Sequence, residues 1–138
     1  MATKQVGLGA LVKVDDDGDA SFTTVGLTRS ITPPPRSRAL VDGTALEDDL
    51  AVNEAGIEEA SELSFTQFWH PGDTNHEIMD TLFGSKAKVD WQIVYPFATP
   101  VTDEFEGFVS ALAPEQIEPG NIISRQVTVQ RTGAITRT

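Results

Sequence analysis

The chain has 138 residues, of which 39% are hydrophobic and 22% charged, so it can build one folded domain with its own core but not two. The absence of cysteine excludes a disulfide framework and a thiolate metal site, and favours a cytosolic chain. We expect a soluble protein without a membrane partner, because no signal peptide follows the N-terminus and no apolar run approaches the length of a membrane span.

The net charge of −11 is concentrated in one continuous third of the chain. Residues 39–85 contain no Lys or Arg but eleven acids, namely Asp42, Glu47, Asp48, Asp49, Glu54, Glu58, Glu59, Glu62, Asp73, Glu77 and Asp80. Such a block disfavours tight binding to a nucleic-acid backbone. Two interpretations stay open: a solvated surface that keeps the chain soluble, or a surface with a specific use.

The N-terminal part predicts a β-hairpin. Residues 9–14 and 20–28 are rich in β-forming residues and flank an Asp-Gly turn within residues 15–19. The four aspartates of that turn also suggest a calcium loop, but the terminal Glu and the flanking helices of an EF-hand are missing. An exposed polar turn is therefore the favoured interpretation.

A long acidic segment follows the hairpin. Three prolines, residues 33–35, are expected to end the second strand because proline cannot donate a hydrogen bond to a sheet. Residues 39–62 then show neither a helical nor an alternating hydrophobic period. We interpret residues 39–60 as a structureless long arm or loop, with a helical turn near residues 46–50.

One helix is predicted near the middle of the chain. A strand over residues 63–69 is stopped by residues 70–73, and Asp73, Thr74 or Asn75 can then cap a helix. Gly84 is suited to the end of this helix. The residues expected on its buried face are Ile78, Met79, Leu82 and Phe83.

Three further strands are predicted after the helix. Residues 89–95 alternate in hydrophobicity, residues 102–112 form a second strand with a bulge or bend at Gly107, and residues 121–131 form the last. About six strands and one short helix predict a mostly β fold, a β-sandwich with a flanking helix, as a single domain over residues 1–138.

The search for chemistry yields no reaction centre. His70, Asp73 and His76 lie close enough in sequence to consider a zinc or iron site, but Asp73 is also the natural helix cap. The sequence has no nucleophile elbow and no phosphate-binding loop. Trp69 and Trp91, set in strands, are typical of a core or an interface. We therefore predict no catalytic, cofactor-binding or metal-binding residue and no enzyme.

The order of elements resembles the tail tube subunit, or major tail protein, of long-tailed bacteriophages. The resemblance covers residues 20–136 and rests on the following segments: 76–84 with 89–95, 105–109, 119–121 and 126–130. It implies a β-sandwich that assembles as hexameric rings, with a continuous inner β-barrel, stacked into a tube through which DNA is ejected. It also implies an arm that becomes ordered when it contacts the neighbouring ring.

The resemblance implies partners and a location as well. These are further copies of the chain, tail-tip or initiator, tape-measure and tail-terminator proteins, and DNA that passes without tight binding, in a virion tail made in the host cytoplasm. The alternatives are a secretion-system tube protein, a monomeric Ig-like virion decoration or binding module, and a small metal-dependent hydrolase built on His70, Asp73 and His76. Whether the acidic segment lines the channel or serves ring stacking stays open.

Overall fold

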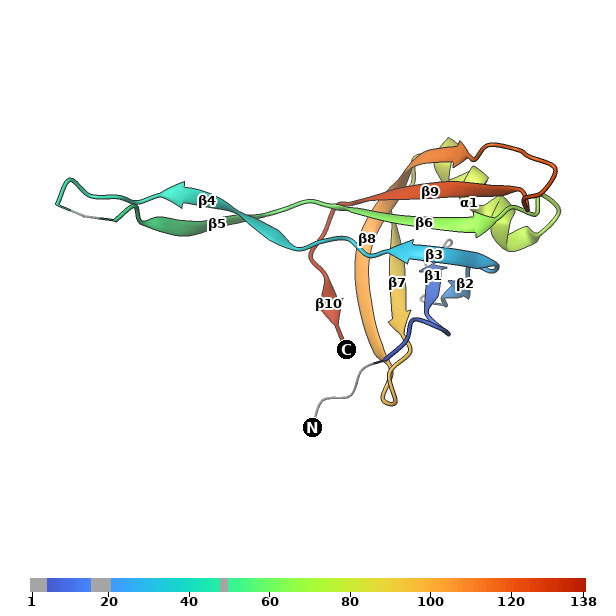
Figure 1. Ribbon diagram of the computed structural model, residues 1–138, viewed down its shortest axis with the longest axis horizontal. Helices are drawn as coiled ribbons and strands as arrows, with labels where there is room; N and C mark the ends of the chain where they lie inside the picture. The colour runs from blue at the N-terminus through green and yellow to red at the C-terminus, as the bar shows by residue number, and fades with distance from the viewer. Residues whose placement is uncertain (1–4, 16–20, 48–49) are drawn as a thin grey trace.

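The computed structural model describes residues 5–15, 21–47 and 50–138, and these contain ten β-strands and one α-helix (Figure 1). The elements in chain order are β1 (Leu11–Asp15), β2 (Thr23–Thr24), β3 (Thr28–Thr32), β4 (Ser37–Asp42), β5 (Asn53–Glu59), β6 (Glu62–Phe68), α1 (Thr74–Ser85), β7 (Val89–Tyr95), β8 (Val101–Pro114), β9 (Ser124–Arg131) and β10 (Thr136–Arg137). The mostly β fold with one short helix is confirmed. The acidic turn considered for calcium falls largely on residues 16–20, outside the described residues.

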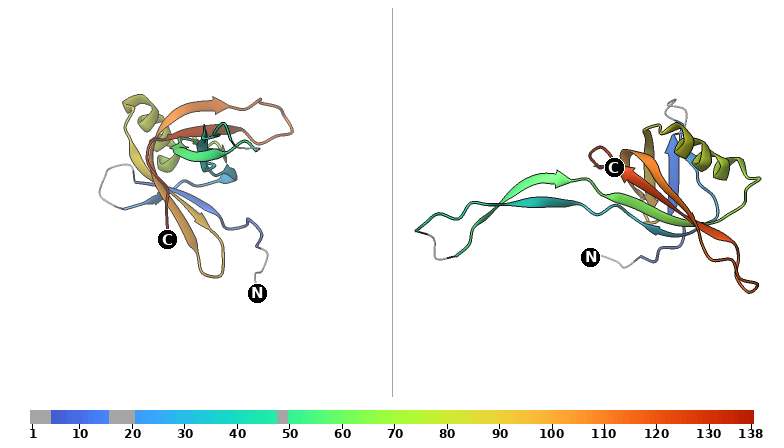
Figure 2. Two further views of the ribbon diagram at one scale, coloured as in Figure 1. Left: turned by 90° about the vertical axis from the view of Figure 1, so that its left-hand side faces the viewer. Right: turned by 90° about the horizontal axis from the view of Figure 1, so that it is seen from above.

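The body of the protein is one antiparallel sheet folded upon itself. Its strand order is β2-β1-β7-β8-β9-β6-β3, with β10 beside β8. Strands β1 and β3, near opposite ends of this order, come into contact. The predicted sandwich is thus confirmed, with its two layers supplied by the two halves of a single hydrogen-bonded sheet (Figure 2).

Strand β8 turns the corner between the two layers. Its first half pairs with β7 and its second half with β9, and Gly107 belongs to both pairings, opposite Val89 and Arg131. A Cβ atom at Gly107 would lie 2.6 Å from the backbone oxygen of Gln130, so only glycine permits this close approach. The predicted bend therefore falls at the corner, whereas the change of register lies between Val109 and Ala111.

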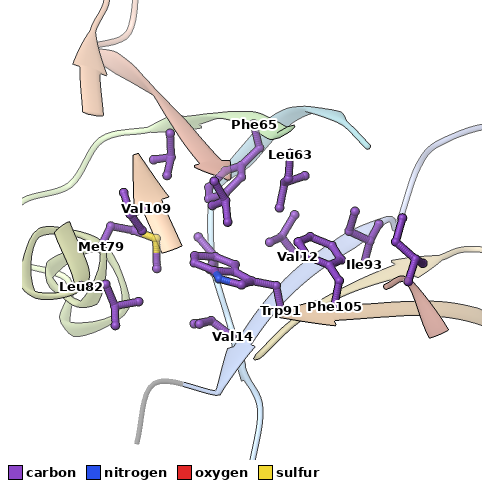
Figure 3. Close-up of a cluster of buried hydrophobic side chains, with 14 residues drawn as sticks. Val12, Val14, Leu63, Phe65, Met79, Leu82, Trp91, Ile93, Phe105 and Val109 are labelled. Atoms are coloured by element: carbon purple, nitrogen blue, oxygen red, sulfur yellow. The ribbon is translucent and has the colours of Figure 1, made fainter. Parts of the chain in front are cut away.

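The core lies between the two layers and is closed by the helix (Figure 3). Val12, Trp91 and Ile93 come from one layer, and Leu63 and Phe65 from the other. The rings of Phe65 and Trp91 have centroids 6.4 Å apart. The Trp91 Nε1 donates to the Gly107 carbonyl at 3.2 Å, so the indole is both packed and hydrogen-bonded, as expected of a core tryptophan.

The second strand of the predicted N-terminal hairpin is divided in two. Strand β2 pairs with β1 over only Thr23 and Thr24, and the chain then turns at Leu27, whose φ is 57°. This turn carries the chain to the other layer, where β3 pairs with β6. A single strand over residues 20–28 was the wrong prediction, because the β-forming composition continues straight through the turn.

Helix α1 begins as predicted and ends two residues later. The Asp73 carboxylate accepts from the Asn75 N–H at 2.8 Å, which is the expected cap. The last helical residue is Ser85 and the stop is the C-cap Lys86, whose φ is 60°, so Gly84 lies inside the helix and is not its stop. Its buried face is His76, Met79 and Leu82, while Phe83 is half-exposed. This helix is neither long nor apolar enough to cross a membrane.

Much of the segment expected to be structureless forms an ordered β-hairpin, which we call the arm (Figure 1). Strands β4 and β5 pair only with each other and project away from the body. The structureless interpretation was wrong because neither strand packs on a core, so no hydrophobic alternation marks them. Of the helical turn expected near residues 46–50, the described part shows a non-helical turn at Leu46 and Glu47; Asp48 and Asp49 lie outside the described residues.

Candidate assembly surfaces

The arm exposes apolar side chains along both of its strands and at its tip. These residues are Leu40, Val41, Leu46, Leu50, Val52 and Ile57. A lone two-stranded hairpin is marginally stable in water, and clustered exposed apolar residues are typical of an interaction surface. The arm is therefore a surface that gains stability when another molecule covers it.

The base of the arm is clamped to the body by Arg131, which is only 3% exposed. Its Nη1 lies 3.2 Å from the Glu58 carboxylate, its Nη2 donates to the Glu59 carbonyl at 2.9 Å, and its Nε donates to the Ser61 hydroxyl at 3.3 Å. Arg36 reaches the same Glu58 oxygen at 3.3 Å and, with Arg131, lowers the pKa of Glu58. This cluster fixes the direction in which the arm leaves the sheet.

The sequence analysis missed two buried arginines of β9, Arg125 and Arg131. Arg125 and Arg131 share the inward face of β9 with Val127 and Val129, and this period of two was present in the sequence. Arg125, 2% exposed, pairs with Asp80 at 3.0 Å and donates to the His76 carbonyl at 2.8 Å. Arg131 holds the arm, whereas Arg125 holds the helix.

The acids of residues 39–85 have several different roles in the structure. Asp73 caps the helix and Asp80 pairs with Arg125, so these two acids stabilise the subunit itself. The described acids of the arm are Asp42, Glu47, Glu54, Glu58 and Glu59. Five of the described acids therefore lie on the arm and its base, where Arg36 and Arg131 pair with one of them, Glu58.

The two end strands of the main sheet each have one edge open for pairing. Strand β3 pairs only with β6, and β2 pairs only with β1, within the described part of the chain. Open edges present unpaired N–H and C=O groups to any neighbouring strand. A ring of copies that pairs such edges would leave none exposed.

The C-terminal strand is fixed by a network around Asp103. Arg137 binds its carboxylate with Nε and Nη2, at 2.7 and 3.0 Å, and the Tyr95 hydroxyl donates to it at 3.1 Å. The hydrogen bond from Arg137 lowers the pKa of Asp103. Burial, together with the charge of Asp103, raises the pKa of Tyr95 to about 12.

We expect the Tyr95 network to make the protein lose stability between about pH 10 and pH 12. A raised folded-state pKa stabilises the fold below the unfolded value, and this contribution is lost as the pH rises through the folded value. Tyr95 is the only tyrosine, so phenolate absorbance reports its pKa directly. The Tyr95→Phe variant should lack this part of the alkaline loss. Titration of Tyr95 near pH 10 would contradict the expectation.

The sequence model of the lambda phage tail tube protein family matches residues 13–138. The chain belongs to the lambda phage tail tube protein family. It is therefore a structural subunit of a tail tube, as the order of its elements predicted. No curated protein matches the tail tube chain in sequence.

Solved structures share the fold of this tail tube chain at low sequence identity. A chain from the tail of an empty gene transfer agent (GTA) particle has a TM-score of 0.81 and 19% identity, with 98% of this chain and 99% of that chain covered. A chain of the anti-feeding prophage baseplate gives 0.82 and 10%, covering 100% and 97%. The SPP1 tail tube gives 0.72 and 8%, covering 94% and 74%. At these identities the similarity shows the fold.

His70 and His76, the candidate metal ligands of the sequence, contribute structural hydrogen bonds in the tail tube chain. The buried His76 accepts from the His70 N–H through Nδ1 at 3.1 Å, so its Nε2 carries the proton and donates to the Gly26 carbonyl at 2.9 Å. His76 thus ties the helix to the turn between β2 and β3. Asp73 is occupied as the helix cap, and no metal-binding group of His, Asp and Glu occurs among the described residues.

Trp69, the other tryptophan of the tail tube chain, is half-buried beside Arg125. The guanidinium of Arg125 lies over its ring, 5.3 Å from the centroid. This contact joins the end of β6 to β9 by a cation–π interaction.

Proposed function

We propose that the chain self-assembles into hexameric rings that stack into the tail tube of a long-tailed phage particle, through which DNA is ejected. The observation that carries the proposal is the projecting arm, a hairpin with exposed apolar side chains that the rest of the subunit does not cover, on a chain of the tail tube family. The similar GTA tail and anti-feeding prophage baseplate are described as sixfold-symmetric, which supports six copies per ring.

In the proposed ring, the folded sheets of neighbouring copies join into a continuous inner β-barrel. The open edges of β2 and β3 support this arrangement, because closure removes edges that would otherwise aggregate. The whole chain, residues 1–138, acts as one domain, and residues 39–60 form the arm that reaches a neighbouring ring. The role is structural and requires no catalytic residue, cofactor or metal.

The proposed partners are further copies of the chain, a tail-tip or initiator complex, tape-measure protein, tail terminator and passing DNA. A net charge of −11 on each copy supports passage of DNA without tight binding, since like charges repel. The proposed location is the virion tail, after synthesis in the host cytoplasm. Because these acids lie on the projecting arm, we favour a role for them in contacts between rings over a role in lining the channel.

Measuring the mass in solution across a wide concentration range tests the proposal. We expect species of six times 14.9 kDa and multiples of that mass, with tail tips lowering the concentration required. A monomeric decoration or binding module would remain at 14.9 kDa at every concentration, even when seeded with tail tips. That result would contradict assembly into a tube.

A tube of an injection or secretion system is the second candidate. The similarity to the anti-feeding prophage baseplate favours it, because that chain has the same fold over nearly its whole length. Both candidates predict rings. Purifying the assembled particles and testing them for packaged DNA separates the two.

A further inference from the structure

The N-terminal segment forms one wall of an apolar groove on the body. Residues 5–10 lie against the beginning of β3 and the end of β7, and together they line a space of about 660 Å³. Its apolar lining includes Val6, Leu8, Ile31 and Phe97. Val6 and Leu8 are mostly exposed, and Phe97 is 47% exposed. An open apolar groove of this kind fits one or two apolar side chains of a partner.

The groove also carries a positive charge. Arg29 lines it and makes no ion pair with any of the described residues. The other three described arginines outside β9, Arg36, Arg38 and Arg137, all have hydrogen-bonded partners. The groove therefore suits an occupant that brings both apolar and acidic side chains.

The tip of the arm carries both apolar and acidic side chains. Leu46 is fully exposed and Leu50 is 79% exposed, with Glu47 between them in sequence. The tip lies within the stretch of residues 39–85 that has no Lys or Arg, so no base on the tip would oppose Arg29. Two leucines would enter the apolar groove while an acid approaches the guanidinium.

The tip and the groove of one copy cannot meet. The arm runs about ten residues outward from the body, roughly 30 Å at the rise of a β-strand. In Figures 1 and 2 it projects away from the body, while the N-terminal segment stays beside β3 and β7. We propose that the arm tip, through Leu46, Glu47 and Leu50, docks in the groove of a second copy. This proposal rests on the proposed tube assembly and assigns its contact surface.

Cross-linking tests the docking directly, because the chain contains no cysteine. Leu46→Cys and Phe97→Cys proteins are mixed, assembled and oxidised. We expect disulfide-linked dimers at least tenfold above those from Leu46→Cys mixed with Phe83→Cys. Phe83 is a matched control, since it lies on the helix and is 48% exposed, almost as much as Phe97.

The outcomes separate the docking from the tube assembly. Tubes that form with no cross-link above the Phe83→Cys control would overturn the docking and leave the tube role intact. A chain that never assembles would overturn both. Preferential linkage at Phe83 would place the arm tip on the helix and also overturn the assignment.

Charge reversal provides a second measurement that needs no cysteine. Arg29→Glu and Glu47→Lys should each raise the concentration needed for assembly about fivefold, the size expected of one exposed ion pair. The double variant should return toward the wild-type value, because the two charges are exchanged. Additive losses in the double variant would contradict a contact between these residues.

Discussion

Replacing Gly107 with alanine is expected to lower the free energy of unfolding by about 2–3 kcal/mol. The added Cβ would lie 2.6 Å from the Gln130 backbone oxygen and 3.0 Å from the Val129 side chain. Neither the backbone nor the packed valine can move without loosening the pairing of β8 with β9. The Gly107 carbonyl also accepts the Trp91 indole N–H, so the shift would reach the core. Chemical denaturation measures the loss.

Gly84→Ala is the matched control for this substitution. Gly84 lies inside α1 with no atom near its added Cβ, so alanine should raise stability by about 0.5–1 kcal/mol through its higher helix propensity. A destabilised Gly84→Ala would support the helix end predicted from the sequence and contradict the structure. A stable Gly107→Ala would contradict the tight corner of the sheet.

Removing the arm is expected to abolish tube formation while leaving the subunit folded. A variant with residues 40–56 replaced by an Asn-Gly turn keeps Glu58 and its contacts with Arg36 and Arg131. It loses exposed leucines at positions 40, 46 and 50, each of which can contribute about 1.5–3 kcal/mol when buried in an assembly. The concentration needed for assembly should rise at least hundredfold. Light scattering against concentration measures this change.

The denaturation midpoint of the shortened chain is the control for folding. Strands β4 and β5 pair only with each other, so the midpoint should stay close to that of the full chain. Normal tubes from the shortened chain would show that the arm is not an assembly surface. A large fall in stability would show instead that the arm supports the body.

Local chemistry explains which elements could be predicted from the sequence. The helix start followed from Asp73, whose carboxylate caps the first turn, and β7 followed from the alternation that buries Trp91 and Ile93. These signals lie within a few neighbouring residues. The order of such elements was enough to indicate the tail tube family, which the family match confirmed.

Features set by distant contacts could not be predicted in the same way. The turn at Leu27 is held by the His76 ring, 50 residues away, through the Gly26 carbonyl. The direction of the arm depends on Arg131, which lies 73 residues from Glu58. Residues 39–60 showed no period because both faces of the arm are exposed, so the sequence could mark an arm but not its strands.

Electron microscopy of the concentrated, purified protein tests whether the chain assembles into rings and tubes. We expect rings of six copies and tubes of stacked rings, in which each arm lies against another copy and the folded sheets line a central channel. Separate particles the size of one chain, at every concentration and in the presence of tail tips, would contradict this expectation.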